Sequence, residues 1–157
     1  MRAPPVSARQ KRGIKRACRE HNPSLVVAHS AAAALAMQLA GIERVIIEPY
    51  FSTGNMMNNF LRGKMWTNFP LLSYGTKGKH IRVTDKCAAE FKELEEKAFN
   101  GDNSITHGVF FSDSTDTACY KEYLKNFGTA LSIPGKNLYG KAEQQQAAKL
   151  IKGLLEC

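Results

Sequence analysis

The most constraining feature of this chain is a short apolar run that is joined to an alanine-rich run through a single serine. The apolar run, residues 25–28, has the β-branched character of a strand buried on both faces. The alanine-rich run, residues 31–39, consists of strong helix formers. Because Ser30 lies between them, the pattern predicts a strand that delivers a serine into a tight turn followed at once by a helix. That is the geometry of a nucleophile elbow.

Two interpretations of Ser30 are open at this point. In a nucleophile elbow the serine hydroxyl attacks an acyl carbonyl, and a backbone N–H at the helix start, here that of Ala31, stabilises the developing negative charge. The usual motif is G-x-S-x-G, and Ala28 and Ala32 occupy the two glycine positions. Alanine meets the need for small residues where strand and helix backbones approach closely. In the other interpretation, Ser30 only caps the helix of an ordinary strand–loop–helix unit.

Length and composition predict a cytoplasmic protein of one domain, residues 1–157. No apolar run approaches the roughly 20 residues of a membrane span, and the first residues lack the apolar segment of a secretion signal. The four cysteines are scattered without a C-x-x-C pair, so we expect reduced thiols, no metal site and no cofactor. Residues 50–82 contain glycines and bulky apolar residues without a sustained periodicity. This pattern predicts an irregular lid-like insertion, although an ordinary loop with its own small core explains it equally well.

The net charge of +8 is partly concentrated near the start of the chain, in Arg9, Lys11, Arg12, Lys15, Arg16 and Arg19. Such a cluster can meet a phosphate backbone or an acidic partner. It lies on a segment with helical spacing, whose buried stripe is predicted to be Ile14, Ala17 and Cys18. Because no aromatic residues are interleaved and no nucleic-acid module follows, the pattern favours a solvated helix face over a nucleic-acid site.

The order of the predicted elements indicates a parallel sheet. Strands are predicted at residues 25–28, 44–48, 106–111 and 129–133. Helices are predicted at about residues 7–21, 31–40, 86–99, 117–126 and 141–155. The helix at 86–99 has Phe91, Leu94 and Ala98 at helical spacing, with Glu95 on its polar face. Alternation of strands and helices predicts right-handed crossovers. We therefore expect a three-layer α/β fold with about four or five mainly parallel strands and helices on both faces.

Candidate site residues follow three of the predicted strands, where ligands collect in an open parallel sheet. They are Ser30 with its neighbour His29, then Asp113 and Asp116, and finally Lys136 and Asn137. A serine, then an acid, then a third group after the last strand is the chain order of α/β-hydrolases.

These segments resemble the YqiA/YcfP-type family of small esterase-type α/β-hydrolases, from about residue 22 to the end of the chain. The resemblance is carried by residues 23–30, 45–49, 108–113, 120–124, 127–128 and 133–135. It implies hydrolysis of a small-molecule acyl ester, with Ser30 as nucleophile and the Ala31 N–H in the oxyanion hole. It also implies that Asp113 or Asp116 orients the base.

The chain departs from the family pattern at the base, the acid and the start of the sheet. Lys136 and Asn137 stand where the family has a histidine, and neither is a general base near neutral pH unless Lys136 is desolvated. The family's acid falls near Ser114, so the nearest carboxylates are Asp113 and Asp116. The family's first strand, which supplies a second oxyanion-hole donor, is missing, and the sheet edge left exposed could support a homodimer.

The other histidines do not replace the missing base convincingly. His29 adjoins Ser30, but neighbouring side chains at a strand end point apart. His107 begins a strand and is expected at the wrong end of the sheet, and His80 lies in the lid-like insertion. Loss of a triad member lowers kcat by about 10⁴ to 10⁶. Two hypotheses therefore lead: a serine esterase with little or no turnover, and a degenerate hydrolase-fold protein that binds a small ligand or a protein partner. A third, less favoured hypothesis is a nucleic-acid-associated protein that uses the basic N-terminal helix, and it predicts binding that weakens steeply with salt.

Overall fold

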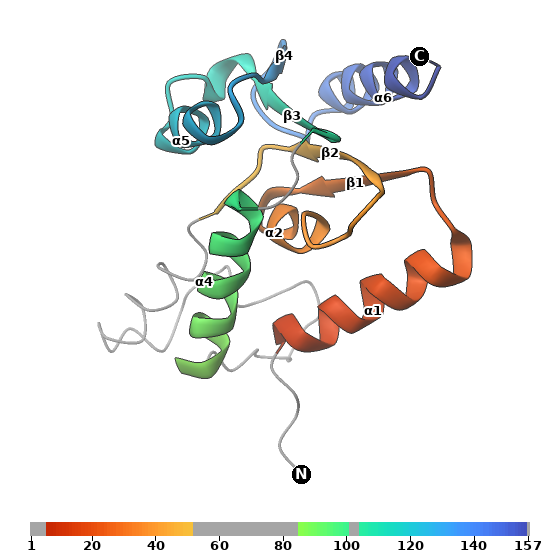
Figure 1. Ribbon diagram of the computed structural model, residues 1–157. Coiled ribbons are helices and arrows are strands. Elements are labelled where there is room, and N and C mark those ends of the chain that lie inside the picture. The colour runs from red at the N-terminus through yellow and green to blue at the C-terminus, as the bar shows by residue number, and fades with distance from the viewer. Residues whose placement is uncertain (1–5, 52–84, 101–103, 157) are drawn as a thin grey trace, which may run out of the picture.

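The computed structural model describes residues 6–51, 85–100 and 104–156 (Figure 1). Its elements, in chain order, are α1 (Val6–His21), β1 (Leu25–His29), the 3₁₀ turn η1 (Ser30–Ala32), α2 (Ala33–Ala36), β2 (Glu43–Ile47), α4 (Asp85–Phe99), β3 (Thr106–Phe111), the 3₁₀ turn η3 (Ser112–Ser114), α5 (Ala118–Phe127), β4 (Leu131–Ile133) and α6 (Lys141–Leu155). Of the insertion predicted at residues 50–82, Tyr50 and Phe51 are described, and the rest lies outside the described residues.

The four strands form one parallel sheet in the order β1-β2-β3-β4. In its register Val27 lies opposite Val45, Ile47 opposite Val109, and Phe111 opposite Ile133. Each strand therefore pairs with the next one along the chain. Right-handed crossovers that all progress in one direction place their helices on one face of the sheet.

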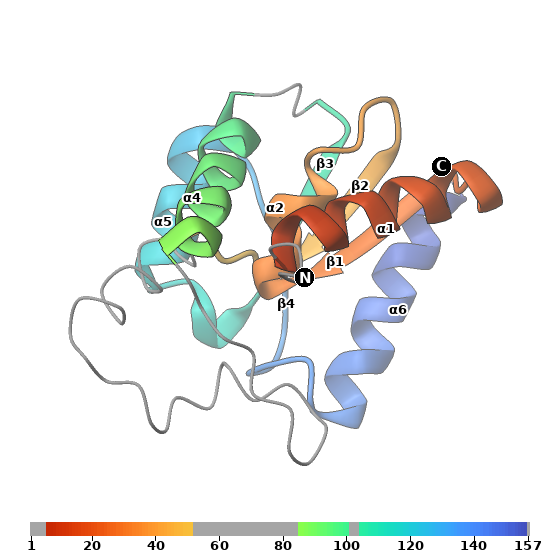
Figure 2. The same cartoon turned by 90° about the horizontal axis from the view of Figure 1, so that it is seen from below.

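The strand side chains alternate between two hydrophobic cores, one on each face of the sheet. Ile46 and Phe110 belong to the core beneath α2, α4 and α5. Ile47, Val109 and Phe111 belong to the other core, which α6 covers. Figure 2 shows α6 on the opposite side of the sheet from α4 and α5. The predicted α/β fold, with a parallel sheet between helices, is confirmed.

Aromatic rings join α4, α5 and the chain that follows β2. The ring centroids of Phe51 and Phe99 lie 4.8 Å apart, and those of Tyr123 and Phe127 lie 4.4 Å apart in a stacked arrangement. Phe110 of β3 meets Tyr123 at 5.3 Å. These contacts are worth about 0.5–1.5 kcal/mol each beyond the apolar area they bury. They fix α5 over the carboxyl half of β3.

The helix after Ser30 is shorter than the predicted span of residues 31–40. It consists of η1 and α2, after which single turns continue to Leu39. Arg44 accounts for this early end, because its buried guanidinium donates Nη1 hydrogen bonds to the carbonyl oxygens of Leu39 at 2.6 Å and Met37 at 3.3 Å. A cation that satisfies the last carbonyls stabilises a helix terminus. Gly41, with φ +71°, then reverses the chain.

Two burial predictions are wrong. Glu95, expected on the polar face of α4, is buried, because this face of the helix lies toward Tyr50, whose pKa Glu95 helps to raise. Ala17, expected in the buried stripe of α1, is exposed, because α1 contacts α2 and α4 through a narrower stripe that includes Ile14. Among the helices that the structure describes, none is long and apolar enough to cross a membrane.

Candidate functional site

The turn at Ser30 has the backbone conformation of a sharp strand-to-helix elbow. His29 ends β1 in an extended conformation, with φ −125° and ψ 138°. Ser30 then has φ +54°, and Ala32 is already helical at φ −67°. A positive φ is uncommon for a residue other than glycine and carries backbone strain. The predicted sequence of strand, tight turn and helix is therefore present at the carboxyl end of β1.

No hydrogen bond among the described residues supports the interpretation that Ser30 only caps the helix. In the described part of the chain, the Ser30 hydroxyl accepts none from the backbone of η1 or α2. Ser30 and Ala31 are half-buried, whereas Ala33 and Ala34 are fully buried. The small side chains of α2 thus let this helix sit directly against β1 and β2, and Ser30 before it remains partly accessible.

The loops that follow β3 and β4 are joined at the same edge of the sheet. The Ser112 hydroxyl accepts a hydrogen bond from the Gly135 N–H at 3.1 Å and donates to the Gly135 carbonyl at 3.2 Å. The backbone N–H of Asp113 also donates to the Gly135 carbonyl, at 3.2 Å. The structure therefore brings the acid loop and the loop of Lys136 together. Asp113, like Asp116 and Lys136, is exposed.

Ser30 is separated from both loops by the order of the strands. Adjacent strands lie about 4.8 Å apart, so β3 is roughly 10 Å and β4 roughly 14 Å from β1. A carboxylate after β3 can therefore act on Ser30 only through a bridging base, as it does in a catalytic triad. Within the described ranges, no side chain hydrogen-bonds to Ser30 Oγ. Asn137 uses its side chain locally, since Oδ1 accepts the Tyr139 N–H at 3.0 Å.

The histidines do not supply that bridge in the described structure. His107 lies at the amino end of the sheet, where its Nε2 is 2.7 Å from Glu43 Oε1. His29 is half-buried as the last residue of β1. His80 lies outside the described residues.

Glu48 is a residue at this edge that sequence reasoning missed. It follows β2 with φ +46°, and its carboxylate Oε1 accepts the backbone N–H of Phe111 at 2.6 Å. Its own N–H donates to the carbonyl of Val109 at 2.8 Å. Glu48 thus clamps the ends of β2 and β3 together. No local signal marked this role, since Glu48 was predicted as the last residue of a strand that ends before Pro49.

Burial and negative charge keep two further groups at this edge protonated. Burial raises the pKa of the Cys119 thiol, and the carboxylates of Glu122 and Glu48 raise it further. Burial also raises the pKa of the Tyr50 hydroxyl, with smaller contributions from Cys119 and Glu95. Because the thiolate is the nucleophilic form of cysteine, Cys119 does not compete with Ser30 as a nucleophile near neutral pH.

No protein-family model and no curated protein matches this chain. The fold defines an α/β protein with a four-stranded parallel sheet. Its most distinctive site feature is the half-buried serine at the elbow after β1. In the part of the chain that the structure describes, no group of three or more His, Cys, Asp or Glu side chains could hold a metal ion.

Proposed function

We propose that this protein is an α/β-hydrolase of the esterase type, related to the YqiA/YcfP-type family, in which Ser30 attacks the carbonyl of a small acyl ester. The observation that carries this proposal is the φ of +54° at Ser30, at the carboxyl end of a parallel strand. Such strain persists where the surrounding structure holds it, and strained residues cluster at functional sites. In a nucleophile elbow, this conformation presents the serine hydroxyl above the sheet.

The order of the strands supports the same proposal. The elbow follows β1, the acid loop follows β3, and the third loop follows β4. The hydrogen bonds between Ser112 and Gly135 hold the second and third loops against each other. A substrate bound across this edge would therefore meet the serine at one end and the acid loop at the other.

In the proposed reaction, Ser30 Oγ bonds to the acyl carbon while the Ala31 N–H donates a hydrogen bond to the carbonyl oxygen as it becomes negative. The alcohol leaves, and water then releases the acid from the serine. Asp113 or Asp116 would orient the base that accepts the serine proton. Lys136 is exposed, so it lacks the desolvation that a lysine acting as general base requires. We expect turnover about 10⁴ to 10⁶ below that of a complete triad.

A second candidate function is ligand or partner binding by a degenerate hydrolase fold, without turnover. It is favoured by one observation: in the described residues, the Ser30 hydroxyl has no hydrogen-bond partner that could accept its proton. The small-molecule site would then be the same edge of the sheet, with the serine contributing a hydrogen bond rather than a covalent bond.

The two functions are separated by labelling and hydrolysis measured on the same preparations. A fluorophosphonate probe followed by peptide mass spectrometry is expected to modify Ser30, and short p-nitrophenyl esters are expected to be hydrolysed slowly. Ser30→Ala should abolish both signals. Ser24→Ala, which changes an exposed serine just before β1, is the matched control and should retain them. Equal hydrolysis by the wild type and Ser30→Ala would refute the esterase. An unlabelled Ser30 would favour the binding function.

A further inference from the structure

The solvent-facing side of α1 carries a dense set of cations. Arg12, Lys15, Arg16 and Arg19 are all exposed. With about 3.6 residues per turn, these four side chains leave the helix within an arc of roughly 100°, and the first and last are about 10 Å apart along the axis. They therefore form one continuous basic face, which we call the α1 basic face.

Among the residues that the structure describes, acidic side chains neutralise little of this positive charge. Arg16 Nε pairs with Glu20 Oε1 at 3.0 Å, but both side chains are exposed, and such pairs are weak. Lys11, the neighbouring half-buried cation, acts on Glu93 of α4, whose pKa is lowered chiefly by Lys97 and to a smaller degree by Lys11. Arg12, Lys15 and Arg19 form no ion pair with any acidic side chain that the structure describes.

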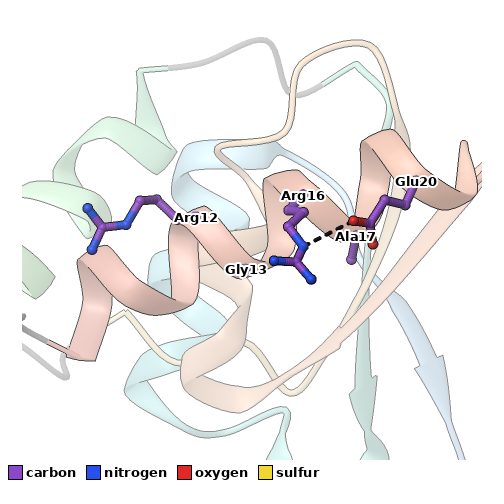
Figure 3. A pocket seen from close by; sticks show the side chains of 5 residues that line it. All are labelled: Arg12, Gly13, Arg16, Ala17 and Glu20. Atoms are coloured by element: carbon purple, nitrogen blue, oxygen red, sulfur yellow. Dashed lines mark hydrogen bonds and ion pairs between the residues drawn. The ribbon is translucent and has the colours of Figure 1, made fainter.

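A shallow hollow of about 370 Å³ lies on the same helix, lined by Arg12, Gly13, Arg16, Ala17 and Glu20. This space is left because Gly13 has no side chain and Ala17 has only a methyl group. Figure 3 shows Arg12 and Arg16 extending from the helix on either side of Gly13, with Arg16 turned toward Glu20. Two guanidinium groups thus border a depression that an incoming anionic group can enter.

The composition of the α1 basic face discriminates between anionic partners. Its exposed residues include no aromatic or large aliphatic side chain. It therefore has no apolar surface to insert into a bilayer and no ring on which an unpaired base could stack. Guanidinium groups match the geometry of phosphate through paired hydrogen bonds. From these observations, we propose that the α1 basic face binds the phosphate backbone of duplex nucleic acid. This binding does not depend on the base sequence of the duplex or on the proposed esterase activity.

The proposal predicts a strong dependence of binding on salt. Neutralising about four phosphates gives a slope of log K against log salt near −3.6, so raising salt fourfold weakens binding about 150-fold. We expect this result for a fluorescent 20-base-pair duplex of arbitrary sequence, measured by anisotropy with the full chain between 50 and 200 mM KCl. A second duplex of unrelated sequence should bind equally.

Charge-removing variants locate the binding surface. Arg12→Gln/Lys15→Gln/Arg19→Gln should weaken binding at 50 mM KCl at least 10-fold and reduce the slope by about 3, because each lost phosphate contact removes about one unit. The matched control, Lys121→Gln/Lys125→Gln/Lys149→Gln, removes three exposed cations from α5 and α6. It should change binding less than threefold. Circular dichroism checks that both variants keep their helices.

Several outcomes would overturn the proposal. Equal weakening by both triple variants would mean that net charge alone attracts the duplex. Absent or salt-independent binding of the wild type would exclude a phosphate contact without recourse to any variant. Binding of phosphatidylserine vesicles or polyglutamate through α1, with no binding of the duplex, would assign the face to a membrane or an acidic protein instead.

Discussion

The backbone N–H of Tyr50 donates a hydrogen bond to the carbonyl oxygen of Ser30 over 3.2 Å. This bond ties the elbow after β1 to the chain that leaves β2, immediately beyond the buried Pro49. A left-handed backbone costs a residue other than glycine about 1–2 kcal/mol. The conformation of Ser30 is therefore held by a neighbouring segment and not by its own preference.

Glycine at position 30 should relieve this strain. We expect Ser30→Gly to be more stable than Ser30→Ala by about 1 kcal/mol, because glycine adopts positive φ without a steric penalty. Urea denaturation of the two variants measures the difference. The φ of Ser24 is not positive, so Ser24→Gly should instead be less stable than Ser24→Ala. Equal stability of the two position-30 variants would contradict a strained elbow.

Replacing Arg44 by lysine should destabilise the protein by about 2–3 kcal/mol. Arg44 is 3% exposed, and it also donates Nε to Thr106 Oγ1 at 3.0 Å. Lysine keeps the charge but cannot reach the Thr106 hydroxyl and the carbonyls of Met37 and Leu39 at once. Chemical denaturation tests this, with the exposed Arg19→Lys expected to change stability by less than about 0.5 kcal/mol. If Arg44→Lys left the stability unchanged, the early end of α2 would need another cause.

A methyl group at Gly108 should not fit. A Cβ built there would lie 2.2 Å from Cζ of Tyr123, whose ring is buried between α5 and β3. Overpacking of this kind costs about 1–3 kcal/mol, so Gly108→Ala is expected to lower the urea midpoint. Gly153→Ala, where nothing lies within 4 Å, should be neutral or raise the midpoint, since alanine favours helix. A stable Gly108→Ala would show that the Tyr123 ring can move.

Tyr123 should make stability fall at alkaline pH. Burial raises the pKa of Tyr123 to about 12, and the nearby backbone of Gly108 offsets part of that rise. The folded state therefore keeps the proton that the unfolded chain loses near pH 10, so stability present below pH 10 decreases toward pH 12, by at most about 2.7 kcal/mol. Tyr123→Phe should lose less stability than the wild type over this range. The control, Tyr139→Phe, changes an exposed ring and should follow the wild type.

The thiol of Cys119 should react slowly with alkylating agents. Its raised pKa keeps the thiolate scarce near pH 7. We expect the midpoint of its iodoacetamide reaction, followed by peptide mass spectrometry, to lie above the ordinary thiol range. Glu122→Gln should lower the midpoint, because it removes a nearby negative charge. Glu20→Gln on α1 should leave it unchanged, and an equal shift in both variants would argue against the local cause.

Local patterns predicted most of the fold because each depends on neighbours along the chain. The strand at Thr106–Phe111 and the helix at Lys141–Leu155 were predicted at their observed bounds. The helix after Ser30 was predicted too long, because Arg44, a residue read as part of a strand, caps it from outside. Burial of Glu95 was also missed, because helical spacing does not reveal which segments of the chain will pack against a given face of α4.

The candidate site was predictable in position but not in its connections. Ser30, Asp113 and Lys136 were placed in loops after strands, and they lie there. The contact of the acid loop with Gly135 could not be foreseen, since it joins residues more than twenty positions apart. Neither could the clamp that Glu48 makes on Phe111, because a lone acid before a proline has no local signature of that role.

By itself, the sequence determined the alternation of strands and helices, the parallel sheet and the elbow at Ser30, since hydrophobic spacing and helix propensity act over a few residues. Tertiary structure alone decided the strained φ of Ser30, the early end of α2 and the joining of the loops after β3 and β4. The early end of α2 depends on Arg44, which reaches the carbonyls of Met37 and Leu39 from its position in β2. The other two depend on hydrogen bonds between residues twenty or more positions apart, and such bonds form only once the sheet has brought the strand ends into line.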